Sequence, residues 1–155
     1  MKQITFFLTV AIVIFNGCDL AGPEERAIRE MIKTFVVSID TDNEELAFAC
    51  LLDGTAFNIL NPDARARSDS ETYIDDFLAE LIHSFRNLSE RFKGKDVKFK
   101  QFNLGSQFYQ YKGFSAFKNN EIVIMVDETE HIIEIGTIVR VGDRWRIIEF
   151  EHYED

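Results

Sequence analysis

The chain has 155 residues, of which 46% are hydrophobic and 28% are charged, with 8 glycines and 2 prolines. This composition is typical of one ordinary globular domain and excludes a disordered, collagen-like or repeat protein. Acidic residues outnumber basic residues 27 to 17, which gives a formal net charge of -10. Such a protein has no positive field to attract phosphates, so we expect no nucleic-acid partner.

The first 17 residues have the layout of a signal peptide. Lys2 supplies a positive charge, the uncharged apolar stretch 4–15 follows, and a polar run begins at Asn16. This order of a basic start, a short apolar stretch and a small-residue cleavage site is that of secreted proteins. Because a membrane-spanning helix needs about 20 apolar residues, we expect the segment to be removed and not to persist as an anchor.

The segment Phe15-Asn16-Gly17-Cys18 resembles the lipobox of bacterial lipoproteins, in which a small residue precedes a cysteine that receives a diacylglyceryl group. Gly17 and Cys18 match that pattern, whereas Phe15 and Asn16 depart from its usual Leu and Ala or Ser. The resemblance implies a signal peptide over 1–17, lipidation of Cys18 and a short tether over 18–23. It implies a protein of the bacterial cell envelope, held to a membrane by lipid and facing the periplasm or the cell exterior. A plain secretory signal with an incidental cysteine is the alternative.

The second cysteine, Cys50, has no partner for a disulfide within the chain if Cys18 carries lipid. It lies in the apolar run 46–52, so we expect a small buried hydrophobic side chain. A catalytic thiolate would need a nearby histidine or helix N-terminus, and the local sequence favours neither.

Residues 24–155 are expected to form a single domain that begins with helices. Pro23 and the acids after it predict a helix that runs to about Ile39. Thr41 and Glu44 have the spacing of a capping box for a short, largely buried helix through Leu52. An irregular region over 54–70 follows, with a short strand over 56–60 and a mobile loop after it.

A long helix over 73–92 follows, preceded by a capping box of Ser68 and Glu71. Everything after Lys95 has the composition of strands. We expect five strands, over 97–104, 107–117, 121–129, 131–141 and 144–153, separated by turns such as Asn119-Asn120 and Gly142-Asp143. Thr129-Glu130 is taken as the turn before 131–141. Helices followed by an antiparallel meander predict an α+β fold.

This order of elements, with the ending Val141-Gly142-Asp143-Arg144-Trp145-Arg146-Ile147-Ile148, resembles the nuclear-transport-factor-2-like superfamily. The cone-shaped fold of that superfamily is shared with ketosteroid isomerase, scytalone dehydratase and polyketide cyclases. The resemblance covers roughly 24–153 and implies helices packed on a curved antiparallel sheet, with a pocket between them. It also implies homodimers through the outer face of the sheet. Because the superfamily contains enzymes, binding modules and lipoproteins, it leaves the function open.

The Gly142-Asp143 turn fixes a register for the last two strands, and this register sorts their side chains onto two faces. The more apolar face is taken as concave, and its predicted pocket-lining residues are Ile135, Thr137, Arg146, Ile148, Phe150 and His152. Arg146 and His152 are the polar exceptions among them. They either serve a ligand in the pocket or lie at the margins of the sheet and reach water.

On the opposite face, Glu134 lies across from Glu151, with Glu149 close by. Carboxylates so placed repel each other, which raises the pKa of a carboxyl group or attracts a cation such as Ca²⁺. Together with His152 they are the candidates for general acid-base catalysis. If this face is external, they form only a solvated acidic surface.

The sequence has no glycine-rich phosphate loop and no histidine or cysteine pair at metal-ligand spacing, so we expect neither a cofactor nor a metal. The aromatic residues within 108–117 are expected to line the core or the pocket. The leading hypothesis is a non-catalytic module that holds a small apolar ligand or a segment of an envelope protein in the cone. The alternatives are a small cofactor-independent isomerase or dehydratase, and a dimeric structural component of an envelope complex.

Overall fold

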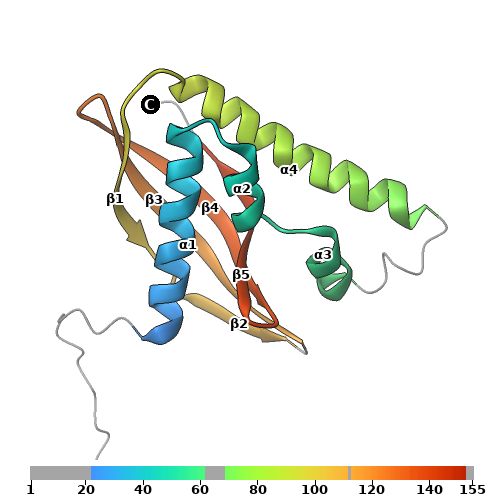
Figure 1. Cartoon of the computed structure of the whole chain (residues 1–155). Helices are drawn as coiled ribbons and strands as arrows, with labels where there is room; N and C mark the ends of the chain where they lie inside the picture. The colour runs from blue at the N-terminus through green and yellow to red at the C-terminus, as the bar shows by residue number, and fades with distance from the viewer. Residues whose placement is uncertain (1–21, 62–68, 112, 153–155) are drawn as a thin grey trace, which may run out of the picture.

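The computed structural model describes residues 22–61, 69–111 and 113–152. Cys18 and the predicted signal peptide therefore lie outside the described residues. The elements in chain order are α1 (Pro23–Asp40), α2 (Glu44–Cys50), α3 (Gly54–Leu60), α4 (Ser70–Phe92), β1 (Val97–Asn103), β2 (Gln107–Tyr111), β3 (Phe114–Val126), β4 (Thr129–Val141) and β5 (Arg144–Glu151). Helices precede an antiparallel sheet (Figure 1), so the α+β class is confirmed. Within the described ranges no helix is long and apolar enough to cross a membrane.

The sheet has the strand order β1-β3-β4-β5, and β2 pairs with β3 on the same edge as β1. The two strands share the long β3 because β1 pairs with its second half and β2 with its first half. Figure 1 shows α1 lying across the sheet, with α2 beside it and α4 running obliquely past their ends.

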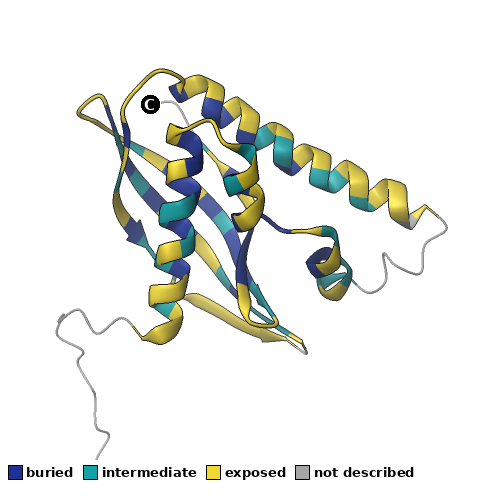
Figure 2. Cartoon of the chain, viewed as in Figure 1, coloured by how far each residue is buried: buried dark blue, intermediate teal, exposed yellow. Residues whose placement is uncertain are grey.

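A single hydrophobic cluster joins the helices to the sheet. The buried side chains of α1 recur every three or four residues, as the sequence predicted, so one stripe of the helix faces the sheet (Figure 2). At the centre, the ring of Phe35 lies 6.1 Å from that of Phe85 and 5.1 Å from that of Phe150. These three fully or nearly fully buried side chains connect α1, α4 and β5.

The short helix α2 begins differently from the prediction. Asn43 caps it, since its side chain accepts a hydrogen bond from Leu46 N at 3.1 Å. Thr41 instead donates its hydroxyl to Val37 O at the end of α1, so the predicted capping box is wrong. The helix is also less buried than expected, because the side chain of Phe48 is 43% exposed.

The predicted strand over 56–60 is wrong, because these residues belong to the helix α3. Asp53 caps this helix by accepting a hydrogen bond from Ala56 N at 2.8 Å. The strand-like pairing lies just before it, where Leu52 N donates to Ile147 O at 2.9 Å along the edge of β5. The loop predicted after α3 falls on residues 62–68, outside the described residues, as does Ser68 of the second capping box.

Two predicted turns are also wrong. Asn119 and Asn120 lie within β3, where Asn119 has a φ of 59° and Asn120 is 1% exposed. The β3–β4 turn is made by Asp127 and Glu128, at φ 47° and 73°, and not by Thr129-Glu130. Positive φ at both central residues is the geometry of a type I′ hairpin turn, which Asp adopts more readily than most residues.

The last hairpin has the predicted Gly142-Asp143 turn, and Glu134 pairs with Glu151 as expected. The register shifts on both sides of Thr137, however, and Thr137 pairs with Glu149 and not with Ile148. In this region three consecutive residues are buried on each strand, Thr137, Ile138 and Val139 on β4 and Trp145, Arg146 and Ile147 on β5. Both faces of the sheet are therefore covered here, and the simple alternation used to assign the faces does not hold.

Candidate functional site

The space between the sheet and the helices, where a pocket was expected, is occupied by packed side chains. Ile122, Ile124, Ile133 and Ile135 are all 0% exposed and belong to the hydrophobic cluster that contains Phe35. Ile135, predicted to line a pocket, is thus a core residue. This interior contributes to stability and leaves the surface depressions as the places to look for function.

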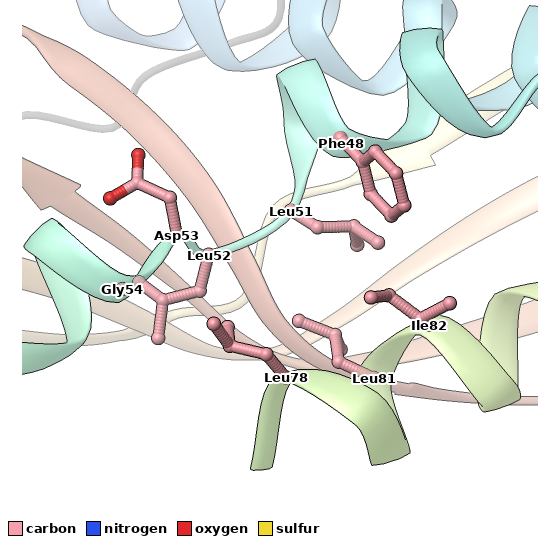
Figure 3. Close-up of a pocket in the computed structure, with 8 residues that line it drawn as sticks. All are labelled: Phe48, Leu51, Leu52, Asp53, Gly54, Leu78, Leu81 and Ile82. Carbon is pink, nitrogen blue, oxygen red and sulfur yellow. The ribbon is translucent and has the colours of Figure 1, made fainter. Parts of the chain in front are cut away.

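An apolar groove of about 210 Å³ lies on the other side of the helical layer, between α2, the connection to α3, and α4 (Figure 3). Its lining residues are Phe48, Leu51, Leu52, Asp53, Gly54, Leu78, Leu81 and Ile82. Of these described residues, all but Asp53 are apolar or glycine. Figure 3 shows the Phe48 ring on one wall and the side chains of Leu78, Leu81 and Ile82 on the other.

The groove exists because both helices carry more apolar surface than the core can cover. The helix α2 has seven residues, and only Ala47 and Cys50 are buried, which leaves Phe48 directed away from the core. On α4, Leu81 is buried while Leu78 and Ile82 remain half-buried. The apolar stripe of α4 is therefore wider than its contact with α1, and its margin forms the groove wall.

An ion pair joins α2 and α4 close to the groove. Arg86 donates from Nε to Glu44 Oε1 at 2.5 Å and from Nη2 to Glu44 Oε2 at 2.9 Å. The hydrogen bonds from Arg86 lower the pKa of Glu44, and the same pairing raises the pKa of Arg86. Glu44 lies one turn before Phe48, and Arg86 lies one turn after Ile82, so the pair marks one end of the groove.

A second, more polar cleft of about 550 Å³ lies at the C-terminal end of α4. It is lined by Arg91, Phe92, Lys95, Glu121, Thr129, Glu130, His131, Ile132, Glu134 and His152. The imidazole Nδ1 of His152 lies 2.6 Å from Arg91 Nη1, and the rings of His131 and His152 are 5.6 Å apart. The ring of Phe92 packs against both imidazoles.

The predicted catalytic residues do not converge on this cleft. Glu134 and His152 line it, but Glu149 and Glu151 line a depression between α4 and β5, together with Glu80. Glu134, Glu149 and Glu151 are all exposed. The described residues contain no group of three or more histidine, cysteine or acidic side chains that could hold a metal.

The structure adds a third glutamate to the predicted pair. Glu121 on β3 pairs with Glu134, which in turn pairs with Glu151, so one row of carboxylates crosses three strands. All three are exposed, as expected of a solvated acidic surface. Glu121 was not predicted to join this row because the β3–β4 turn was placed at Thr129-Glu130, two residues after its true position at Asp127-Glu128. That error shifted the predicted register of β3 against β4.

The remaining predicted pocket residues are dispersed. Thr137 is buried and donates its hydroxyl to Glu149 Oε1 at 3.0 Å, and Phe150 packs on Phe35 in the core. Arg146 is 8% exposed, donates to Ala49 O at 3.0 Å, and lines a depression beside α3. Ile148 is half-buried beside α4. No single cavity of the described residues is built from this set.

Cys50 is 1% exposed, as predicted. Its thiol donates to Met31 O at 3.4 Å, and desolvation raises its pKa to about 11. A thiol with such a pKa is almost entirely protonated at neutral pH, which excludes the role of a catalytic thiolate.

The apolar side chains of the groove belong to the two predicted helices, through Leu52 and over 73–92, which were expected to be buried or packed on the sheet, whereas Asp53 and Gly54 lie in the predicted helix stop. The signal for the groove was the run 46–52, which is apolar on nearly all sides of a helix too short to bury every side chain. No protein-family model, no curated protein and no solved structure matches this chain. The candidate site therefore rests on its own geometry.

Proposed function

We propose that this protein is a bacterial envelope lipoprotein, anchored by a lipid on Cys18, whose domain binds a basic, amphipathic segment of another envelope protein. The domain would have the cone of the nuclear-transport-factor-2-like superfamily but no catalytic role. The observation that carries the proposal is the open apolar groove between α2 and α4, beside a sheet–helix interior that is already filled.

The size and shape of the groove favour a polypeptide over a small molecule. Its volume of about 210 Å³ is below the range of about 300–1,000 Å³ that is usual for small-molecule pockets. Two helices form its walls, and grooves between helices commonly receive the apolar face of a further helix. One or two apolar side chains of a partner helix would lie against Phe48 and Leu78.

The charges around the groove favour a basic partner. Asp53 is part of the lining, and its carboxylate, which lies 3.8 Å from Arg146 Nε, is 53% exposed. Glu45 on α2, and Asp75 and Glu80 on α4, are exposed near the same walls. Because the whole chain has a net charge of -10, a partner segment with lysines or arginines flanking its apolar side chains would be attracted to this surface.

The proposal can be tested with the full chain and a fluorescent amphipathic peptide of leucine and lysine. We expect binding by fluorescence anisotropy, and at least tenfold weaker binding by Phe48→Ser, because the lost burial of one phenylalanine is worth about 1.5–3 kcal/mol. Val37→Ser is the matched control, since Val37 is 49% exposed on α1, away from the groove. It should bind as the parent chain does.

Three results would contradict the proposal. The first is equal binding of a leucine–glutamate peptide, which would remove the argument from charge. The second is an unchanged affinity of Phe48→Ser, which would place the peptide elsewhere. The third is binding of a small apolar probe, such as anilinonaphthalene sulfonate, in the groove without displacement by the peptide. That result would favour a small ligand over a polypeptide.

The rival function, a small cofactor-independent enzyme, has one feature in its favour, the cleft that contains Glu134, His131 and His152. It would need a carboxylate shielded from water, whereas Glu134 is exposed. The interaction module is therefore the function that the geometry supports best.

A further inference from the structure

The strand β2 and the first residues of β3 form a hairpin whose aromatic side chains are open to solvent on both faces. Phe108 lies on one face and Tyr109 and Tyr111 lie on the other, because successive side chains of a strand point to opposite faces; together they are called the aromatic surface. All five residues of β2 are exposed, and the side chains of Phe108, Tyr109 and Tyr111 are 49%, 38% and 44% exposed. The prediction that the aromatic residues within 108–117 line the core or a pocket is thus wrong for these three, whereas Phe117 packs against the core. Aromatic side chains at this level of exposure and density are typical of a contact surface.

The aromatic side chains are held in place by contacts with one another. The ring of Tyr111 stacks on those of Tyr109 and Phe114, with centroids 6.1 Å and 4.5 Å apart. Phe108 packs against Phe117, whose ring lies 5.7 Å from that of the buried Trp145. Phe108 is therefore anchored to the core through Phe117, and on the opposite face Tyr109 and Tyr111 are held by stacking with Phe114, before any partner arrives.

The charge of this region differs from that of the rest of the chain. Residues 104–120 contain two lysines and no acidic residue, although the whole chain has a net charge of -10. Lys118 Nζ lies 5.2 Å from the centroid of the Tyr109 ring. A surface that combines aromatic rings with lysines and lacks carboxylates is compatible with anionic phospholipid headgroups, which the other surfaces would repel.

The aromatic surface lies close to the point where the chain enters the domain. Gln110 of β2 pairs with Ser115, which pairs with Arg140 of β4, and Arg140 forms an ion pair with Glu24 in the first turn of α1. Figure 1 likewise shows α1 beginning at the end of the molecule where β2 lies. Only four peptide steps separate Cys18 from Gly22, and these can span at most about 14 Å.

From these observations we infer that the β2–β3 aromatic surface contacts the headgroup region of the membrane that carries the anchor. The inference takes from the proposed function only that the N-terminal segment holds the chain at a bilayer. Tyrosine and other aromatic side chains favour the membrane–water interface because their rings are apolar and their edges or hydroxyls are polar. Contact at two points, the anchor and the aromatic surface, fixes the orientation of the domain and leaves the groove accessible.

The inference can be tested by fluorescence quenching in vesicles of phosphatidylethanolamine and phosphatidylglycerol that contain a nitroxide-labelled lipid. The full chain is reconstituted with a fluorophore on Gln110→Cys, or, as the control, on Ile132→Cys. Ile132 is 51% exposed and lies on β4. The residues of β4 that pair with the aromatic part of β3 are 137–141, which are five to nine residues, or about 17–30 Å, away from Ile132 along the strand. At pH 7 the buried Cys50 thiol stays unlabelled because its pKa is about 11. Labelling of the parent chain, which has no added cysteine, gives the background from Cys18.

We expect quenching at position 110 to be at least threefold stronger than at position 132. In the Gln110→Cys background, the exposed pair Phe108→Ser and Tyr111→Ser should reduce it at least twofold while circular dichroism stays unchanged. Equal quenching at the two positions would overturn the inference. So would a chain that fails to sediment with the vesicles, or a dimer in which β2 of a second copy shields position 110 from lipid. Peptide binding in solution is measured separately, so its failure would count against the groove and not against this surface.

Discussion

The Cys50 side chain links the chemistry of one residue to the stability of the fold. Its thiol lies between α2 and α1, donates to Met31 O, and has a pKa raised from 9.0 to about 11 by desolvation. A group whose pKa is raised on folding stabilises the folded state below its unfolded pKa, and this contribution is lost as the pH rises toward the folded value. For Cys50 that window extends from about pH 9 to about pH 11.

Between pH 8.5 and pH 11 the free energy of unfolding should fall in both the parent chain and the Cys50→Ala variant. We predict that the fall is about 2–3 kcal/mol larger in the parent chain. Urea denaturation at a series of pH values measures both, and the comparison removes the titration of tyrosines and lysines, which the two chains share. Parallel pH profiles for the two chains would show that the thiol is not desolvated as described.

At the scale of the elements, Asn120 holds β3 in position. Its amide Nδ2 donates to Phe117 O and Ile135 O, and its Oδ1 accepts from Gly105 N. One buried side chain thus joins the connection before β2 to β3 and β4. Gly105 must be a glycine because a Cβ there would lie 1.8 Å from Lys118 O.

Asn120→Ala leaves one buried and two partly buried backbone groups without these partners, and we predict a loss of about 2–4 kcal/mol in the free energy of unfolding. Asn119→Gly is the matched control, because Asn119 is exposed and its φ of 59° suits glycine. Urea denaturation of both variants is the measurement. A loss for Asn120→Ala no greater than that for Asn119→Gly would contradict this role.

This part of the sheet also shows why the sequence predicted some elements and not others. The long helix α4 was predicted because its apolar residues repeat at helical spacing over many turns. The Asn119-Asn120 pair has the composition of a turn, but tertiary hydrogen bonds to Asn120 keep the strand continuous. Similarly, 56–60 looked like a strand by residue type, whereas the Asp53 cap and the burial of Phe57 against α4 make it a helix.

The candidate site was harder to predict than the fold. The register around Thr137 shifts twice, and these shifts depend on contacts on both faces of the sheet. Gly136, a glycine inside the strand, was a local sign of the irregularity that the prediction did not use. The groove depends on how much of the α2 and α4 surface the core covers, a property of the assembled helices. The hairpin turn at Gly142-Asp143 was predictable because two residues fix it directly, and the Glu134–Glu151 pair agreed with the prediction because the two register shifts between the turn and this pair cancel.

At the scale of the whole molecule, we propose an N-terminus anchored by lipid, near the exposed aromatic surface of β2 and β3 and apart from the groove between α2 and α4. For the anchor, we predict that Cys18→Ala abolishes incorporation of labelled palmitate and moves the protein from the membrane to the soluble fraction of cells that express it. Cys50→Ala should keep both the label and the membrane fraction. Label retained by Cys18→Ala would exclude lipidation at this cysteine.

Hydrogen–deuterium exchange of the full chain, with and without the leucine–lysine peptide, measures whether the groove between α2 and α4 is the binding site. We predict increased protection confined to the α2 and α4 residues around Phe48 and Ile82. Protection that appears instead at the cleft of Glu134 and His152, or nowhere, would contradict the account.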